Sequence, residues 1–161
     1  MIKFLFFLHF ILISNLYSFE LKCTFEEVYS DGSVQNGFFL IKDKKLRYEY
    51  NSENLFTIFH NNERFFLVKN NDKEIINTIT ENTEIIKELL NIANNFPNIE
   101  EEYTSEDLKI KLEKNANGSF FKRISIASTK IKMSIFLNDC KNTKINARYF
   151  IHNPFFDYKF N

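Results

Sequence analysis

The sequence lacks most of the features on which catalytic and metal sites are built. It contains only three glycines and two cysteines in 161 residues, and it has neither a glycine-rich phosphate loop nor a G-x-S-x-G nucleophile elbow. Beyond residues 1–18 the histidines are His60 and His152, which lack metal-ligand spacing, and no H-E-x-x-H or C-x-x-C motif is present. The sequence therefore predicts a protein that is not an enzyme, with no catalytic residue, no metal site and no cofactor.

An excess of one charge is also missing. The 21 lysine and arginine residues equal the 21 aspartate and glutamate residues, and the sequence pI is about 6.8. A protein that binds a phosphate backbone usually shows a basic excess or stripe, so we expect no nucleic-acid partner. The aromatic composition is unusual, with 20 phenylalanines and no tryptophan. A chain of this length suits one domain with a sizeable core.

The longest apolar run is confined to the N-terminus, where residues 1–18 have the pattern of a secretory signal peptide. Lys3 supplies the positive charge, residues 4–13 form a short apolar run, and Ser18 is a small residue at a plausible cleavage point. The alternative is an uncleaved membrane anchor, but the apolar run falls short of the roughly 20 residues that a membrane span needs. We therefore expect export and a mature domain at residues 19–161.

If the protein is exported, the two cysteines, Cys23 and Cys140, are candidates for a disulfide. In an oxidising compartment they would be able to form a disulfide that ties the first strand to a late one. Two separate thiols are the alternative, because the sequence does not show whether the two Cα atoms lie within bonding distance.

Turn residues divide the rest of the chain into short segments with the pattern of strands. Asp31-Gly32 is a strong hairpin signal, since both residues tolerate positive φ, and Asn61-Asn62 and Asn117-Gly118 also favour tight turns. This spacing predicts a mainly β protein of about ten or eleven antiparallel strands, as in a barrel or a strongly curved sheet. The expected strands are 23–29, 34–42, 46–51, 54–60, 64–69, 74–80, 108–114, 119–127, 130–137, 143–152 and 155–160.

One segment, residues 82–96, has the periodicity of an amphipathic helix instead. Asn82 or Thr83 suits its N-cap, and Pro97 stops it. Its apolar residues recur at the i, i+3, i+4 and i+7 spacing of a single helix face. That face consists of Ile85, Ile86, Leu89, Leu90, Ile92, Ala93 and Phe96.

The strand at 38–41 is apolar at every position, whereas residues 46–50 alternate between apolar and charged side chains. An antiparallel strand with one solvated face alternates, so a strand that does not alternate must be covered on both faces. We expect a curved sheet whose concave face is roofed by the 82–96 helix, with Arg47 and Glu49 facing water on the other side. The concave face would carry Phe39, Ile41, Leu46, Tyr48 and Tyr50. Such a concavity is either a filled core or an apolar ligand cavity, and composition alone favours the core.

Three neighbouring segments form one motif: Gly37 to Lys42, the run Leu46-Arg47-Tyr48-Glu49-Tyr50, and residues 58–66. Together they resemble the periplasmic outer-membrane lipoprotein carrier (LolA) family. That family shows a glycine, a strand that ends in a basic residue, an "L-R-W-E-Y"-like strand, and then a turn with an aromatic strand. Here Tyr48 stands where tryptophan is usual. The resemblance covers roughly residues 25–80, and the rest of the chain agrees only in the order of its elements.

The resemblance implies an incomplete antiparallel barrel with a helical lid, which carries acylated lipoproteins through the periplasm. Its implied partners are acylated lipoproteins, an inner-membrane lipoprotein-releasing transporter and an outer-membrane acceptor, and we expect a monomer. The lid would be the helix face with Ile85, Ile86, Leu89, Leu90 and Ala93. The implied acyl-chain-binding residues are Phe39, Ile41, Leu46, Tyr48, Tyr50, Phe56, Ile58 and Phe66.

The chain also departs from the family pattern. No helix precedes the first predicted strand, and Asp43-Lys44 stands where the family has an Arg-Pro pair whose arginine is implicated in lid control. Lys42 or Lys44 is the candidate replacement for that arginine, without its forked geometry. The alternative function is a secreted β-rich domain with a packed core that binds another protein and no lipid.

Overall fold

The computed structural model describes residues 20–61, 64–77, 83–96, 98–105, 107–116 and 120–152. The predicted signal peptide at 1–18 and the predicted last strand at 155–160 lie outside these ranges.

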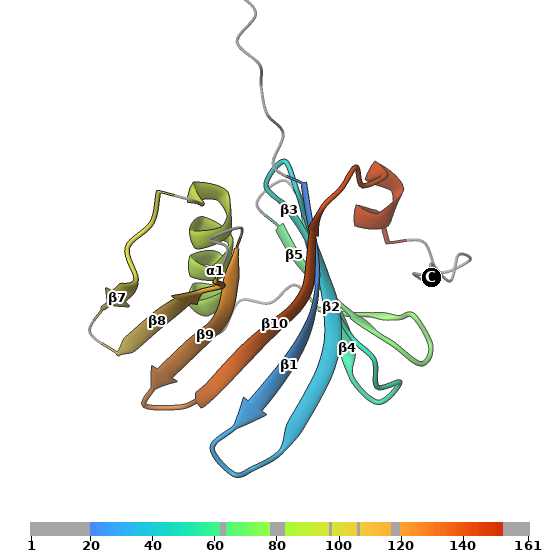
Figure 1. The fold of residues 1–161 in the computed structure, drawn as a ribbon. Helices are drawn as coiled ribbons and strands as arrows, with labels where there is room; N and C mark the ends of the chain where they lie inside the picture. The colour runs from blue at the N-terminus through green and yellow to red at the C-terminus, as the bar shows by residue number, and fades with distance from the viewer. Residues whose placement is uncertain are drawn as a thin grey trace, which may run out of the picture.

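The described chain is mainly β and forms one open antiparallel sheet of ten strands, in the order β6-β5-β4-β3-β2-β1-β10-β9-β8-β7 (Figure 1). The prediction of a mainly antiparallel β protein is therefore confirmed. The N-terminal strands are β1 (Glu20–Tyr29), β2 (Val34–Lys42), β3 (Lys45–Tyr50), β4 (Phe56–Asn61), β5 (Arg64–Lys69) and β6 (Ile75–Asn77). The C-terminal strands are β7 (Glu102–Thr104), β8 (Leu108–Lys114), β9 (Phe121–Ser128) and β10 (Lys132–Asn142).

The helix α1 spans Thr83–Asn95 and is the one α-helix among the described residues. Its position agrees with the amphipathic pattern predicted for residues 82–96. Figure 1 shows α1 within the curve of the sheet, between the β8–β9 end and the β3–β5 end.

Tight turns of the expected chemistry join the first strands. Gly32 lies at φ 84° in the β1–β2 hairpin, a conformation that glycine adopts without steric cost. Asp43 and Lys44 lie at φ 47° and 64° between β2 and β3, which is the left-handed pair of a two-residue hairpin turn. Asp43 and Lys44 therefore form the turn between β2 and β3.

The pairing of β1 with β10 joins the two halves of the sheet. Every other neighbouring pair of strands in the described sheet is consecutive along the chain, so β1–β10 is its long-range pairing. The register shifts between Lys22 and Thr24 of β1, where Asp139 of β10 has φ 50°. This irregularity is a β-bulge, which bends a strand and strengthens its twist.

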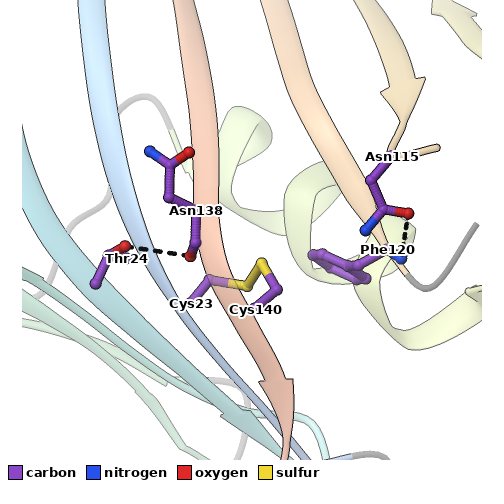
Figure 2. Close-up of a disulfide and its surroundings, with 6 residues drawn as sticks. All are labelled: Cys23, Thr24, Asn115, Phe120, Asn138 and Cys140. Atoms are coloured by element: carbon purple, nitrogen blue, oxygen red, sulfur yellow. Dashed lines mark hydrogen bonds between the residues drawn. A yellow bond between two sulfur atoms is a disulfide. The ribbon is translucent and has the colours of Figure 1, made fainter. Parts of the chain in front are cut away.

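Cys23 and Cys140 meet at this bulge and form a disulfide across β1 and β10 (Figure 2). Next to it, the Thr24 hydroxyl donates a hydrogen bond of 3.1 Å to the Asn138 carbonyl. Of the two alternatives that the sequence left open, the structure thus has the paired cysteines, and the Cys23 side chain is fully buried.

Gly37 of β2 allows aromatic residues of β1 and β3 to pack together across it. It lies opposite Phe25 of β1 and Tyr50 of β3, and a Cβ atom at this position would lie 2.5 Å from the Phe25 ring. Without that atom, the Phe25 ring reaches across to stack on Tyr48, with 4.1 Å between ring centroids. Gly37 thereby helps to place the Tyr48 and Tyr50 side chains on the concave face.

The C-terminal segment corrects one predicted strand. Residues 143–152 do not continue the sheet; instead they lead into a short 3₁₀-helix, η1 (Ala147–Phe150). The Asn146 side chain accepts a hydrogen bond from the backbone N–H of Arg148 at 3.0 Å, which caps this turn. Ile145 and Phe150 pack on Leu40, so η1 covers the convex face of β2 to β4 and explains why residues 38–41 are apolar at every position.

The same cover corrects the expected exposure of Arg47. Its side chain was expected to face water, yet Arg47 is only 6% exposed. The guanidinium lies over the rings of Phe38 and Phe59 and pairs with Glu49. It also donates to the Tyr149 carbonyl of η1 at 3.3 Å. The convex face is therefore closed over this part of the sheet.

Candidate functional site

An apolar cavity of about 310 Å³ lies between the concave face of the sheet and α1. This volume is at the lower end of the roughly 300–1,000 Å³ that ligand pockets usually occupy. It is well above the about 150 Å³ of an engineered apolar cavity that binds benzene. Strands from both halves of the sheet contribute to the wall. The lining side chains are Glu27, Tyr29, Phe39, Ile41, Leu46, Tyr48, Tyr50, Phe56, Ile58, Ile85, Ile86, Leu89, Leu90, Ile92, Phe120, Phe121, Ile124, Ile131, Met133, Ile135 and Leu137.

The strands β2 to β4 supply one wall, and it contains most of the residues that the resemblance implied. Seven of the eight line the cavity: Phe39, Ile41, Leu46, Tyr48, Tyr50, Phe56 and Ile58. They come together because each lies at an inward position of the register between neighbouring strands, as in the pairs Phe39–Tyr48 and Tyr48–Ile58.

Phe66 does not line the cavity. It lies opposite Phe59 across β4 and β5, and Phe59 contacts Arg47 on the convex face. Its neighbour Phe65 is 4% exposed and belongs to the main core instead. The assignment of Phe66 to the cavity fails because β5 is apolar at successive positions, so its sequence does not reveal which alternate set faces inward.

The helix α1 forms the roof over this wall. The predicted lid residues Ile85, Ile86, Leu89 and Leu90 all line the cavity, as does Ile92. Leu90 and Ile92 are buried, whereas Ile85, Ile86 and Leu89 are half-buried. The side chain of the remaining predicted lid residue, Ala93, lies outside the described part of the structure.

The strands β9 and β10 supply the opposite wall, which the sequence interpretation did not assign. Its members are Phe120, Phe121, Ile124, Ile131, Met133, Ile135 and Leu137. The sequence did contain a signal for the β10 residues. Ile131, Met133, Ile135 and Leu137 recur at every second position, so their side chains point to the same face of a strand. Without the β1–β10 pairing, however, nothing placed that face opposite β3 and β4.

The cavity wall includes one buried acid, Glu27, which the sequence interpretation also missed. Glu27 is 2% exposed, and its carboxylate accepts hydrogen bonds from three tyrosine hydroxyls. Tyr29 donates to Oε2 and Tyr48 to Oε1, each at 2.6 Å, while Tyr50 lies 2.9 Å from Oε2. The only signal for Glu27 in the sequence was its spacing. It follows Cys23 and Phe25 at every second position of β1, so all three side chains point to the same face of the strand.

This environment raises the pKa of all three tyrosines. Burial, aided by the hydrogen bond to Glu27 and by its negative charge, raises the pKa of Tyr29 to about 12. Burial, followed by the charge of Glu27, also raises the pKa of Tyr48 and Tyr50 above the usual tyrosine value. The hydroxyl donors therefore keep their protons well into the alkaline range.

These pKa shifts predict a loss of stability at alkaline pH. An unfolded tyrosine ionises near pH 10, whereas folded Tyr29 keeps its proton up to about 12. The tyrosine contribution is fully present below about pH 10, and above it the unfolded state binds fewer protons, so the free energy of unfolding falls as the pH rises. Denaturant unfolding curves across this window measure the slope, which should be shallower in Tyr29→Phe than in the wild type. An equal slope in the two proteins contradicts the assignment.

Among the residues that the structure describes, no group of three or more His, Cys, Asp or Glu side chains is arranged to hold a metal ion. No helix in the same part of the chain has the length and apolarity needed to cross a membrane.

Comparison with known proteins assigns no family to this chain. Neither a family model nor a curated protein matches the chain.

Proposed function

We propose that this protein is an exported carrier that holds the acyl chains of lipoproteins in the cavity beneath α1 and takes them toward the outer membrane. The observation that carries the proposal is the apolar cavity of about 310 Å³ that lies between the concave face of the sheet and the apolar face of α1. A domain with a fully packed core would have no void larger than a few water molecules at this place. The open, curved sheet then acts as an incomplete barrel, and α1 acts as its lid.

The chemistry of the wall suits an acyl chain. Apart from Glu27 and the tyrosine hydroxyls, its lining groups are aliphatic, aromatic or thioether side chains, so an aliphatic chain leaves few polar groups unsatisfied there. Each CH₂ group that moves from water into such a site contributes about 0.8 kcal/mol. Binding of this kind needs no covalent step, in agreement with a carrier rather than an enzyme.

The side chains of the two covers differ in burial, which supports a lid role for α1. Ile85, Ile86 and Leu89 of α1 are only half-buried, whereas Phe150 of η1 is 2% exposed. Large side chains and the cavity separate α1 from the sheet. Because the cavity is small for a ligand pocket, a full acyl chain would require α1 to move outward.

The periplasmic setting and the docking partners belong to the same proposal. The disulfide between Cys23 and Cys140 suits an oxidising compartment such as the periplasm. From the resemblance, the carrier would receive its cargo from an inner-membrane releasing transporter and deliver it to an outer-membrane acceptor.

The lid control of this carrier must differ from the family pattern. Lys42 pairs with Glu20 at 2.9 Å and donates to the Ile145 carbonyl at 2.8 Å, and Lys44 is exposed in the β2–β3 turn. Neither lysine lines the cavity, so neither replaces the family arginine there.

The proposal is tested by comparing a synthetic acylated lipopeptide with the same peptide without its acyl chains. The acylated peptide should displace a fluorescent acyl probe from the mature protein, and the unacylated peptide should not, because the apolar wall recognises the chains. Equal displacement by both peptides, or no probe binding by a folded protein, would show that the cavity does not carry acyl chains. The second outcome would instead favour the packed protein-interaction domain.

A further inference from the structure

The cavity contains one charged group for which acyl binding provides no role. Glu27 is buried and lines the cavity, yet none of the other lining side chains is lysine, arginine or histidine. Among the described residues, no lysine or arginine forms an ion pair with it. A buried carboxylate without a cation is unfavourable unless hydrogen bonds compensate it. A wall made only for acyl chains would be more stable with an aliphatic residue at this position.

The hydrogen bonds around Glu27 leave the cluster rich in acceptors. A tyrosine hydroxyl has one proton to donate, and Tyr29, Tyr48 and Tyr50 all direct theirs to the Glu27 carboxylate. The lone pairs of the carboxylate and phenol oxygens remain, and no donor in this cluster is left over for a ligand. The cluster therefore offers a ligand negative charge, hydrogen-bond acceptors and the faces of aromatic rings.

The cluster lies toward the more open end of the cavity. Tyr29 is opposite Met133 near the start of β10, and Tyr29, Ile131, Met133 and Phe56 are all half-buried. At the opposite end of the sheet, Ile41 of β2, Leu46 of β3 and Phe121 of β9 are almost fully buried. An apolar chain that fills the closed end would thus leave its polar end group beside Glu27.

We propose that Glu27, with Tyr29, Tyr48 and Tyr50, is a subsite for a positively charged amino group attached to or next to the acyl chain. This inference rests on the proposed acyl-binding function and adds the charge of the ligand that the cavity accepts. A lipoprotein would supply such a group from a basic side chain near its acyl anchor. A carboxylate or phosphate at the same place would meet a like charge and no hydrogen-bond donor, so anionic lipids are selected against.

The experiment compares three ligands with the same alkyl chain and different end groups: a primary amine, an alcohol and a carboxylate. Each competes with a neutral fluorescent acyl probe for the wild type, Glu27→Gln and Glu26→Gln. Glu26 is a matched control, because it is the exposed neighbour of Glu27 on β1. The formal charge of the whole sequence is zero, so we expect no general preference for cationic ligands.

We expect the wild type to bind the amine at least about tenfold more tightly than the carboxylate, with the alcohol between them. Glu27→Gln should bind the amine and the alcohol equally, and Glu26→Gln should keep the wild-type order. If the probe binds and the three ligands compete equally, or if Glu27→Gln keeps the preference for the amine, the subsite is refuted while the carrier proposal stands. If none of the ligands binds the wild type, both proposals fail. The wild-type order decides the question even if Glu27→Gln does not fold.

Discussion

Replacing both Cys23 and Cys140 with alanine should lower the free energy of unfolding by about 4 kcal/mol. The two cysteines are 117 residues apart in sequence, and closing so long a loop removes much of the conformational freedom of the unfolded chain. The bond also lies on the β1–β10 pairing, which joins the two halves of the sheet. A loss of this size is a large part of the roughly 5–15 kcal/mol by which a typical domain is stable.

Denaturant unfolding curves with and without a reducing agent measure this effect. Reduction should destabilise the wild type to the level of the double variant, and it should leave the double variant unchanged. Identical wild-type curves under both conditions would mean that the bond contributes nothing to stability. The double variant separates the loss of the bond from other effects of the reductant.

Truncating Leu90 to alanine should lower stability and raise acyl affinity at the same time. Leu90 is 6% exposed on α1 and lines the cavity, so its truncation should cost about 2–5 kcal/mol. Alanine keeps the helix propensity of this position. If α1 and the acyl chain compete for the same wall, weaker closure makes the binding-competent open state more populated and tightens apparent binding.

Phe150→Ala provides the matched control on the opposite face. Phe150 is 2% exposed beneath η1 and packs on Leu40, so its truncation should cost about 3–5 kcal/mol. Because it does not line the cavity, acyl affinity should stay at the wild-type value. The two variants are compared by probe titration and by unfolding. If Leu90→Ala loses acyl affinity together with stability, α1 is not a lid. If acyl affinity rises in both variants, the cause is a general loss of stability of the domain and not the opening of α1.

The fold was largely predictable because its turns and periodicities are local features. Asp31-Gly32 marked the first hairpin, the apolar face beginning at Ile85 marked α1, and alternation at Leu46, Tyr48 and Tyr50 marked the wall of β3. The failures arose where distant residues decide the structure. The segment 143–152 has strand-like composition, but the Asn146 cap and the packing of Phe150 on Leu40 favour the short 3₁₀-helix at Ala147–Phe150 instead.

Only one wall of the candidate site was predictable from the sequence. The wall from Phe39 to Ile58 followed from the strand pattern and the resemblance, whereas Phe66 was misplaced because both faces of β5 are apolar. The wall on β10 and the Glu27 cluster depend on the β1–β10 pairing, which joins opposite ends of the chain. No local sequence pattern indicates that Tyr48 and Tyr50 donate hydrogen bonds to the carboxylate of Glu27, which lies more than 20 residues earlier in the chain.

The most direct test of the carrier proposal is to fill the cavity and measure acyl binding. Leu137→Trp places a larger side chain at a buried position of the β10 wall, while Ile151→Trp adds the same side chain at a position that is 57% exposed. The chain has no other tryptophan, so indole fluorescence reports whether each new side chain lies in an apolar site. Both variants and the wild type are titrated with a fluorescent acyl probe, after unfolding curves show that they are folded. We expect wild type and Ile151→Trp to bind alike and Leu137→Trp to bind at least about tenfold more weakly, because its indole occupies the space of the chain. Equal binding by all three folded proteins, or no binding by the wild type, would contradict the proposal that this cavity carries acyl chains.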